Sequence, residues 1–411
     1  VGEHRSPHYD KAWQVEESNE FGTDEFVAFC RKIEAVPYIC TNAGTGTAEE
    51  MSDWVEYCNL GTQGRHARAR IANGSRQPHR VPIWSIGNEN YGSWEMGAKA
   101  SREWGRFVLE SAKMMKAADP DIELSAASIT DLDWNLNLLR EAGAFLDWIS
   151  IHRYWDMIHQ TNALSPYEQC MVFSADVSSD IQQIEHVLGS LGYLGKISIA
   201  FDEWNLRGWY HPGGDRTVPE RVAARDENDR NESYTMADAI FTACFLNELH
   251  RHTDTVKMAN FAPVVNTRGL IYAYPDGIVL RPTYHVFALF TQQLGALVVD
   301  SRLQTTPSFE VHTDSGSVSV PAIDSITTMD DAGDLRISLV NRHPEKPQEI
   351  RIALTRSEDV LRSGDVLAQA AEDGGPGDGR ADDAPHGTSV ARAVLYSIAP
   401  DSKDAWNGIS Q

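Results

Sequence analysis

Short apolar runs alternate with amphipathic stretches along residues 1–295 of the chain. Six runs have the continuous apolar character of strands buried on both faces, and they cover residues 36–42, 81–88, 122–128, 147–155, 196–205 and 255–263. Seven stretches repeat apolar positions at helical spacing, near residues 23–33, 47–58, 104–118, 134–143, 178–191, 235–250 and 282–295. This alternation predicts an α/β fold, with a parallel sheet covered by helices on both sides.

Local signals support two of the predicted helix ends. Thr47 and Glu50 have the spacing of a capping box, in which each side chain bonds the other residue's backbone N–H. Asp119 and Pro120 follow the third helical stretch, and proline cannot continue a helix. We therefore expect one helix to begin after Thr47 and another to end before Asp119.

The number of elements suggests a specific architecture. A closed (β/α)8 TIM-type barrel has eight strands and eight helices, whereas this pattern supplies six strands and seven helices and begins with a helix. The chain also begins with Val1 rather than methionine. We therefore predict that residues 1–295 form a barrel that lacks two strands and one helix at its amino end, as part of a longer gene product.

The pattern changes at about residue 296. Period-two alternation between turn residues is typical of antiparallel strands, and it occurs in the segments ALVVDSR, SFEVHTD, SVSVPAI, LRISLVNR, QEIRIAL and RAVLYSIA. Residues 371–387 between them are rich in Gly, Asp and Pro, which predicts a disordered loop. We assign residues 296–411 to a β-sandwich domain behind the barrel.

Charge and cysteine content narrow the function. The formal net charge of −23 disfavours binding to nucleic acid or to anionic lipid, and no apolar run reaches the about 18 residues of a membrane span. The five cysteines are odd in number, scattered, and lack the spacing of a metal site. Unpaired thiols favour a reducing compartment, and we predict a cytoplasmic protein.

Two glutamates follow predicted strands. Glu89 comes after IWSIGN and Glu203 after ISIAFD, so both should lie at the carboxyl rim of the barrel, where active sites form. Alone, each could be a solvated or salt-bridged strand end. Together they are the pair that glycoside cleavage needs, one protonated to donate and one ionised to attack.

Other polar and aromatic residues share this rim. His152 and Tyr154 end one strand on the same side, and Tyr154 could hold an ionised carboxylate through its hydroxyl. For His152, a scaffold role and a catalytic role both remain open. Aromatic residues that could be core or a sugar-stacking platform are Trp94, Tyr154, Trp155, Trp204, Trp209 and Tyr210.

Several motifs together carry a family resemblance. The segments SNEFGTDEF, NAGTGTAEE, WVEYCN, IWSIGNEN, ISIHRYW and FDEWN resemble glycoside hydrolase family 51, the retaining α-L-arabinofuranosidases of clan A. The resemblance extends from about Trp13 to Leu294. It implies that Glu89 is the acid/base, that Glu203 is the nucleophile, and that arabinofuranosyl oligosaccharides or polysaccharides are substrates. It also implies a homo-oligomer for the full-length protein.

The resemblance further implies a set of pocket residues, to which we add His152 from its place on the rim. Asn88 matches the asparagine that binds the sugar hydroxyl beside the anomeric carbon, and Tyr154 matches the tyrosine at the nucleophile. Trp209 matches a pocket-closing tryptophan. Trp13 and Asn42 match positions near the pocket. No metal or organic cofactor is implied, because two carboxylates carry the chemistry.

Departures from the family pattern keep alternatives open. The family has a glutamate and an arginine on its first two barrel strands, and no segment of this chain corresponds to them. Pro263 stands where many members have a glutamine ligand, for which Asn266 and Arg268 are candidate substitutes. The rival functions are another clan A glycosidase, such as a β-xylosidase or endoglucanase, and a sugar-binding fragment without turnover.

Overall fold

The computed structural model describes residues 5–13, 15–158, 164–209 and 234–353. All six predicted strands are present, and they pair in parallel in chain order as β3-β4-β5 and β6-β7-β8. A bridge between Ala127 and Ser150 joins the two ladders. The strands are β3 Tyr38–Thr41, β4 Ile83–Ile86, β5 Glu123–Ala126, β6 Trp148–Ile158, β7 Ser198–Trp209 and β8 Val256–Phe261. The predicted parallel α/β arrangement is confirmed.

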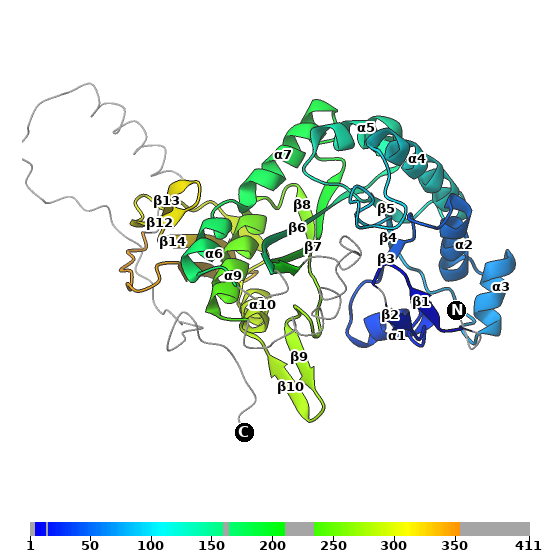
Figure 1. The fold of residues 1–411 in the computed structure, drawn as a ribbon, viewed down its shortest axis with the longest axis horizontal. Helices are drawn as coiled ribbons and strands as arrows, with labels where there is room; N and C mark the ends of the chain where they lie inside the picture. The colour runs from blue at the N-terminus through cyan, green and yellow to red at the C-terminus, as the bar shows by residue number, and fades with distance from the viewer. Residues whose placement is uncertain (1–4, 14, 159–163, 210–233, 354–411) are drawn as a thin grey trace, which may run out of the picture. The chain divides into compact units, whose positions relative to one another are not determined.

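All seven predicted helices are also present: α1 Thr23–Lys32, α2 Ala48–Asn59, α4 Ser101–Ala118, α5 Leu132–Ala142, α7 Val177–Ser190, α9 Met236–Arg251 and α10 Pro282–Gln293. Helices α2, α4, α5 and α7 follow one another along the outer side of the strands (Figure 1). Two further helices, α3 Arg65–Ala72 and α6 Tyr167–Ser174, and the 3-10 turn η2 Gly143–Phe145 were not predicted. Helix α3 was not predicted because its sequence has no apolar stripe, and the residues it buries are only Ala67 and Arg70.

The helix-end signals act as the sequence predicts. Thr47 Oγ1 accepts a hydrogen bond from the Glu50 N–H at 3.2 Å, and Glu50 Oε2 accepts one from the Thr47 N–H at 2.8 Å. These two bonds satisfy backbone donors that have no partner inside helix α2. Helix α4 ends at Ala118, directly before Asp119. Both ends are therefore encoded locally.

The parallel strands form an arc with two edges. Within the described residues, β3 pairs only with β4, and β8 pairs only with β7. This is the six-strand arrangement that the pattern predicts for residues 1–295. Two short hairpins were not predicted: β1 His8–Asp10 with β2 Val15–Glu17, and β9 Ile271–Tyr274 with β10 Gly277–Leu280. The Pro275-Asp276-Gly277 sequence is a turn signal that could have revealed the second hairpin.

Antiparallel strands follow helix α10. They pair as β11-β14-β15 and β12-β13, with bounds β11 Leu297–Val299, β12 Ser308–Thr313, β13 Gly316–Pro321, β14 Ile323–Met329 and β15 Leu335–Asn341. Strand β14 was not predicted, because its Asp, Ser and Thr side chains hide the alternation although most of them are buried. Among these, Asp324 accepts from Asn247 Nδ2 of helix α9 at 2.8 Å.

Parts of the predicted β-sandwich are not borne out or lie outside the described residues. Residues 348–353 of the segment QEIRIAL form no strand, and within the described residues β15 pairs only with β14. Alternation alone does not make a strand, since a strand also needs a hydrogen-bonding partner. The loop at 371–387 and the segment RAVLYSIA lie outside the described residues. The boundary between residues 295 and 296 stays a prediction, and it falls between α10 and β11.

Strands β6 and β7 continue as a ribbon past the other barrel strands, and a buried ion-pair cluster holds their ends. Arg207 of β7 donates through Nε to Asp238 Oδ1 of α9 at 2.9 Å and through Nη1 to Asp156 of β6. All three side chains are buried, with Arg207 only 1% exposed. Burial disfavours the charged guanidinium, but Asp238 and Asp156 outweigh this and raise the pKa of Arg207. The cluster ties three elements together.

We expect Arg207→Met to lower the free energy of unfolding by about 3–5 kcal/mol, because it leaves two buried carboxylates without their cation. Urea denaturation followed by tryptophan fluorescence measures the change. Arg106→Met is the control, since the Arg106–Glu110 pair is exposed and worth at most about 1 kcal/mol. Equal, small losses in both variants would contradict a stabilising role for the cluster.

No helix among the described residues combines the length and the apolar character needed to cross a membrane. Four of the five cysteines are buried free thiols, and Cys40 is the exposed one. Cys30, Cys58 and Cys244 lie in predicted helical stretches and are buried, whereas Cys40 is exposed although it lies in the predicted buried run 36–42.

Candidate active site

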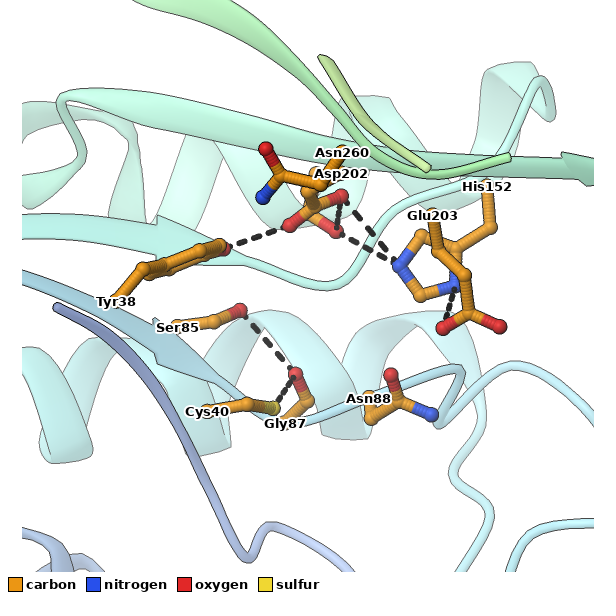
Figure 2. A pocket seen from close by; sticks show the side chains of 10 residues that line it. Tyr38, Cys40, Ser85, Gly87, Asn88, His152, Asp202, Glu203 and Asn260 are labelled. Carbon is orange, nitrogen blue, oxygen red and sulfur yellow. Dashed lines mark hydrogen bonds and ion pairs between the residues drawn. The ribbon is translucent and has the colours of Figure 1, made fainter. Parts of the chain in front are cut away.

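A bulge in strand β7 shapes the site. Between Phe201 and Trp204, β7 has one residue more than either neighbour: it spans three positions where β8 spans two, and the β6 register shifts at the same place. A bulge re-aims side chains that strict alternation would send to opposite faces. As a result, Asp202 and Glu203 are adjacent in sequence and both line the same cavity (Figure 2).

This cavity has a volume of about 180 Å³ and extends from within the parallel strands, at Tyr38 and Ser150, to the segment after β4, at Asn88. Residues from β3, β4, β6, β7 and β8 and from the turn after β4 surround it. They are Tyr38, Cys40, Ser85, Gly87, Asn88, Ser150, His152, Asp202, Glu203 and Asn260. Nearly all are polar, so the cavity offers many hydrogen-bonding groups in a small space, as recognition of a sugar requires.

Glu89 lies in the turn that follows β4. Gly87 has a φ of +73°, and a Cβ there would approach Asn90 Oδ1 to 2.1 Å, so the turn needs glycine. Glu89 itself has a φ of +47°, a strained conformation for a residue with a side chain. Its Oε2 accepts a hydrogen bond from Trp94 Nε1 at 2.6 Å, and its Oε1 lies 3.0 Å from His152 Nδ1.

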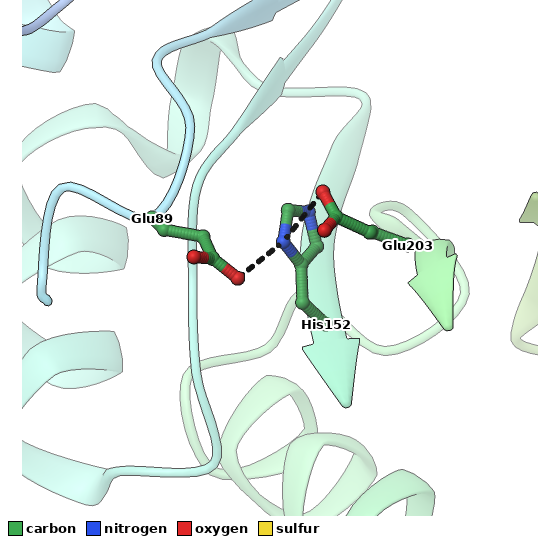
Figure 3. A group of neighbouring side chains, drawn as sticks. All are labelled: Glu89, His152 and Glu203. Carbon is green, nitrogen blue, oxygen red and sulfur yellow. Dashed lines mark hydrogen bonds and ion pairs between the residues drawn. The ribbon is translucent and has the colours of Figure 1, made fainter. Parts of the chain in front are cut away.

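Glu203 faces Glu89 across His152 (Figure 3). His152 Nδ1 lies 3.3 Å from Glu203 Oε2, and the Tyr154 hydroxyl donates to Glu203 Oε1. One oxygen of each glutamate and a His152 nitrogen all lie within 4.8 Å of one another. Carboxyl groups about 5 Å apart are typical of retaining glycosidases, whereas inverting enzymes separate them by about 6.5–9.5 Å. The geometry therefore supports the retaining pair.

The protonation states around Glu203 follow from its neighbours. Burial disfavours a charged imidazole, but the contacts with Asp202 and Glu89 and the charge of Glu203 raise the pKa of His152 well above its ordinary value. These neighbours therefore favour the imidazolium form of His152. Burial and the charge of Glu203 raise the pKa of the Tyr154 phenol, so this hydroxyl keeps its proton and donates it. The Arg268 guanidinium lies over the Tyr154 ring, 4.5 Å from its centroid.

The remaining predicted site residues lie in different places. Asn88 lines the cavity. Asn42 caps a turn, because its Oδ1 accepts from the Gly44 and Thr45 N–H groups at 3.0 Å. Trp13 lies in the turn between β1 and β2, is 41% exposed, and is not among the residues that line the cavity. Trp209 is the last residue of β7, and its side chain lies outside the described atoms.

The aromatic residues divide between core and site. Trp155 and Trp204 are buried and pack on Phe245 with ring centroids 5.6 and 3.8 Å apart, so they belong to the core. Trp94 is 37% exposed and contacts Glu89, and Tyr154 contacts Glu203. Tyr210 lies outside the described residues.

The two candidate substitutes for the missing glutamine, Asn266 and Arg268, have side chains that make different contacts. Asn266 Oδ1 accepts from the Ala273 N–H at 2.8 Å, so its side chain serves the β9 hairpin. Arg268 instead reaches Tyr154, and its carbonyl accepts a hydrogen bond from Asn205 of β7 at 2.9 Å. Arg268 is therefore the one of the two that contacts the site.

Two acidic residues of the site were not recognised in the sequence. Asp202 was missed because alternation places it opposite Glu203. Glu95 lies in the same loop as Glu89, and its position six residues later was the available signal. Burial and the charges of Glu89 and Glu203 raise the pKa of Glu95 to about 7. A third carboxyl group is therefore largely protonated beside the pair below neutral pH.

Relative to the wild type, Glu95→Gln should be more stable at pH 8 than it is at pH 5. A carboxyl whose pKa is raised on folding contributes stability that is complete below its unfolded pKa and is lost as the pH rises through its folded pKa, here about 7. Glutamine cannot ionise and escapes this loss. Thermal unfolding at both pH values measures the difference, with the exposed Glu16→Gln as control. An identical pH dependence in the wild type and Glu95→Gln would contradict the expectation.

Glu89, His152 and Glu203 are the only described group of three side chains whose possible metal-ligating atoms lie so close together. However, His152 Nδ1 is already shared between the two carboxylates, and Nε2 faces Asp202 at 3.4 Å. An imidazolium has no lone pair for a metal. The group fits an ion-paired proton-transfer site better than a metal site.

Comparisons with known proteins agree with this geometry. The family models described as "Alpha-L-arabinofuranosidase 1 domain" and "Alpha-L-arabinofuranosidase C-terminal domain" match residues 2–171 and 202–374. The chain is 30% identical to an "Intracellular exo-alpha-(1->5)-L-arabinofuranosidase" of Halalkalibacterium halodurans, over 82% of this chain and 68% of that protein.

Two solved structures are similar over a comparable extent. The α-L-arabinofuranosidase of Thermotoga maritima, in an arabinose complex, is 34% identical with a TM-score of 0.68, and the match covers 82% of this chain and 67% of that one. The thermostable GH51 α-L-arabinofuranosidase of Thermotoga petrophila is 33% identical with a TM-score of 0.70, over 84% of this chain and 69% of that one. The chain thus spans about two thirds of the length of these relatives.

Proposed function

Because this chain belongs to the α-L-arabinofuranosidases of glycoside hydrolase family 51, we propose that it releases terminal α-L-arabinofuranosyl residues from oligosaccharides and polysaccharides with retention of configuration. One observation carries the proposal. Glu89 and Glu203 bring carboxylate oxygens within 4.8 Å of each other beside a polar cavity. That separation suits a covalent double displacement.

In the first step, a carboxylate oxygen of Glu203 attacks the anomeric carbon while Glu89 donates its proton to the departing glycosidic oxygen. The bond from carbon to that oxygen breaks, the aglycone leaves as an alcohol, and an ester joins the sugar to Glu203. Tyr154 donates a hydrogen bond to Glu203 Oε1 and orients the attacking group. Glu89 ends the step as a carboxylate.

In the second step, Glu89 accepts a proton from a water molecule, whose oxygen attacks the same carbon from the side that the aglycone left. The ester bond breaks, Glu203 regains its charge, and Glu89 regains its proton. Two inversions at one carbon give net retention. Glu89 can donate a proton in the first step and accept one in the second, because Trp94 and His152 hold its two oxygens in one place.

Substrate recognition rests on the residues around the cavity. Asn88 stands beside Glu89 and lines the cavity, in reach of a sugar hydroxyl next to the anomeric carbon. We also assign His152, Trp209, Trp13 and Asn42 to the pocket region, on the strength of the family motifs. We place the catalytic site within residues 1–295 and treat residues 296–411 as a separate sandwich domain.

A pair of aryl glycosides tests the proposal. The chain should hydrolyse aryl α-L-arabinofuranoside and release the retained anomer, as followed by proton NMR in the first minutes. Activity on aryl β-D-xylopyranoside instead would favour the rival glycosidases. Binding of arabinofuranosyl oligosaccharide without turnover on either substrate would favour a sugar-binding fragment.

Assembly and location belong to the same proposal. We expect a homo-oligomer in the full-length protein, which light scattering after gel filtration would test. The relative from Halalkalibacterium halodurans is named intracellular, and we extend that location to this chain. The net charge of −23 on the present chain suits neutral glycans as partners rather than nucleic acid.

A further inference from the structure

The residue before Glu203 has an unusual position. In a regular strand, Asp202 and Glu203 would point to opposite faces of the sheet. The bulge between Phe201 and Trp204 turns both carboxylates toward the cavity instead. The side chain of Asp202 is only 7% exposed there. A buried carboxylate is costly unless it is paired and hydrogen-bonded, so its partners indicate its role.

Asp202 has partners on two other strands, β3 and β6, and Figure 2 shows two of them, Tyr38 and His152. Its Oδ2 accepts a hydrogen bond from the Tyr38 hydroxyl of β3 at 2.6 Å. Its Oδ1 accepts one from the Ser150 hydroxyl of β6 at 2.8 Å and lies 3.4 Å from His152 Nε2. Among the described residues, His152 is the basic side chain paired with Asp202.

The contacts of His152 continue toward the reacting groups. While Nε2 faces Asp202 and Ser150, Nδ1 faces Glu89 Oε1 at 3.0 Å and Glu203 Oε2 at 3.3 Å (Figure 3). The ring thus has an acidic partner at each nitrogen. If both ring nitrogens are protonated, each can donate to the carboxylate that it faces.

We infer that Asp202 is a positioning residue for the reaction proposed above: with Tyr38 and Ser150, it holds His152 as a doubly protonated ring between Glu89 and Glu203. The positive charge then favours the ionised, attacking form of Glu203. Asp202 does not touch the reacting atoms itself. Its effect passes through His152, in the way that a carboxylate orients the catalytic histidine of other hydrolytic sites.

Other charged and titratable groups also surround His152, and they set the background for a pH test. They lie on strands β3, β6 and β7 and in the segments that follow β4 and β8, and they are Tyr38, Cys40, Glu89, Tyr91, Glu95, Tyr154, Asp202, Glu203 and Arg268. Of these, Asp202 is the acidic partner of Nε2, whereas Glu89 and Glu203 contact Nδ1.

Asp202→Asn tests the inference through the pH profile. With His152 neutral, Glu203 loses the positive charge beside its ionised form, and the acidic limb of kcat/KM should move to higher pH by on the order of one unit. We expect kcat to fall about 10- to 100-fold with little change in KM. If His152 kept its charge, loss of the Asp202 charge would instead move the limb to lower pH, and that result would overturn the inference.

Tyr38→Phe and Asp324→Asn complete the design. Tyr38→Phe removes one hydrogen bond to Asp202 and should move the acidic limb in the same direction by a smaller step. Asp324→Asn alters another buried carboxylate, one paired with Asn247 and Arg251 away from the cavity, and should change stability without moving the limb. If the acidic limb of the kcat/KM profile moved equally in Asp324→Asn, the shift in Asp202→Asn would be a general structural effect, and the positioning role of Asp202 would be contradicted.

Nitrogen NMR of labelled histidine gives a readout that does not depend on activity. The His152 ring signals, assigned by their loss in His152→Asn, should show an imidazolium at pH 8 in the wild type and a neutral ring in Asp202→Asn. A neutral ring in both proteins, or an imidazolium in both, would overturn the inference. An inactive wild-type chain would count against the proposed function, and the NMR comparison would then decide the inference alone.

Discussion

Glu203→Ala is expected to lower kcat on the aryl arabinofuranoside by on the order of 10⁴-fold or more, and azide should restore part of the rate. Without the side chain, a small anion can occupy the position from which Glu203 Oε2 attacks. Azide then displaces the aglycone in a single inverting step, so the product is the glycosyl azide of inverted configuration. Proton NMR of the product measures the configuration.

A matched control separates this loss from a general effect of removing a carboxylate. Glu185 is also a partly buried glutamate paired with a histidine, His252, at 3.0 Å, but it lies on helix α7. Glu185→Ala should keep activity and show no azide effect. Azide rescue of Glu203→Ala that gives the retained product would remove Glu203 from the nucleophile role.

Glu89→Ala should discriminate between leaving groups. Proton donation to the departing oxygen contributes about 10²–10⁴-fold when the leaving group is a poor one, such as a sugar hydroxyl. A dinitrophenolate leaves without that help. We therefore expect a large fall in kcat/KM on arabino-oligosaccharides and a much smaller fall in the first step with dinitrophenyl arabinofuranoside.

Pre-steady-state kinetics test this assignment. In Glu89→Ala the second step also lacks its base, so an activated substrate should give a burst of dinitrophenolate followed by slow turnover. Trp94→Phe is a useful companion, because it removes only the hydrogen bond from Trp94 Nε1 to Glu89 Oε2 and should cause a smaller loss of the same kind. Equal losses on both substrates in Glu89→Ala would contradict the acid role.

Much of the fold could be predicted because the signals are local. Each of the six parallel strands is an apolar run, and each of the seven predicted helices carries an apolar stripe, so period and burial agree. Strand β14 and helix α3 were missed because their burial is decided elsewhere. Asp324 is buried in β14 because Asn247 and Arg251 of helix α9 satisfy it, and no local pattern contains those partners.

Some residues of the candidate site could likewise be predicted from local sequence signals, and others could not. Glu89 and Glu203 could be predicted because parallel strands bring their carboxyl ends to one rim, whatever the details of packing. The contact between Tyr154 and Glu203 followed from alternation on the neighbouring strand. Asp202 could not be predicted, because the bulge that turns it inward exists only through the registers of β6 and β8 against β7.

The sequence alone therefore determined the order of elements, the two glutamates and the family resemblance, since each depends on residues that are close together in the chain. Only the tertiary structure decided that His152 lies between the carboxylates of Glu89 and Asp202, because these partners come from other strands. It also decided that Trp155 and Trp204 belong to the core and not to a sugar platform. Charge states and burial depend on neighbours distant in sequence, which only folding brings into contact.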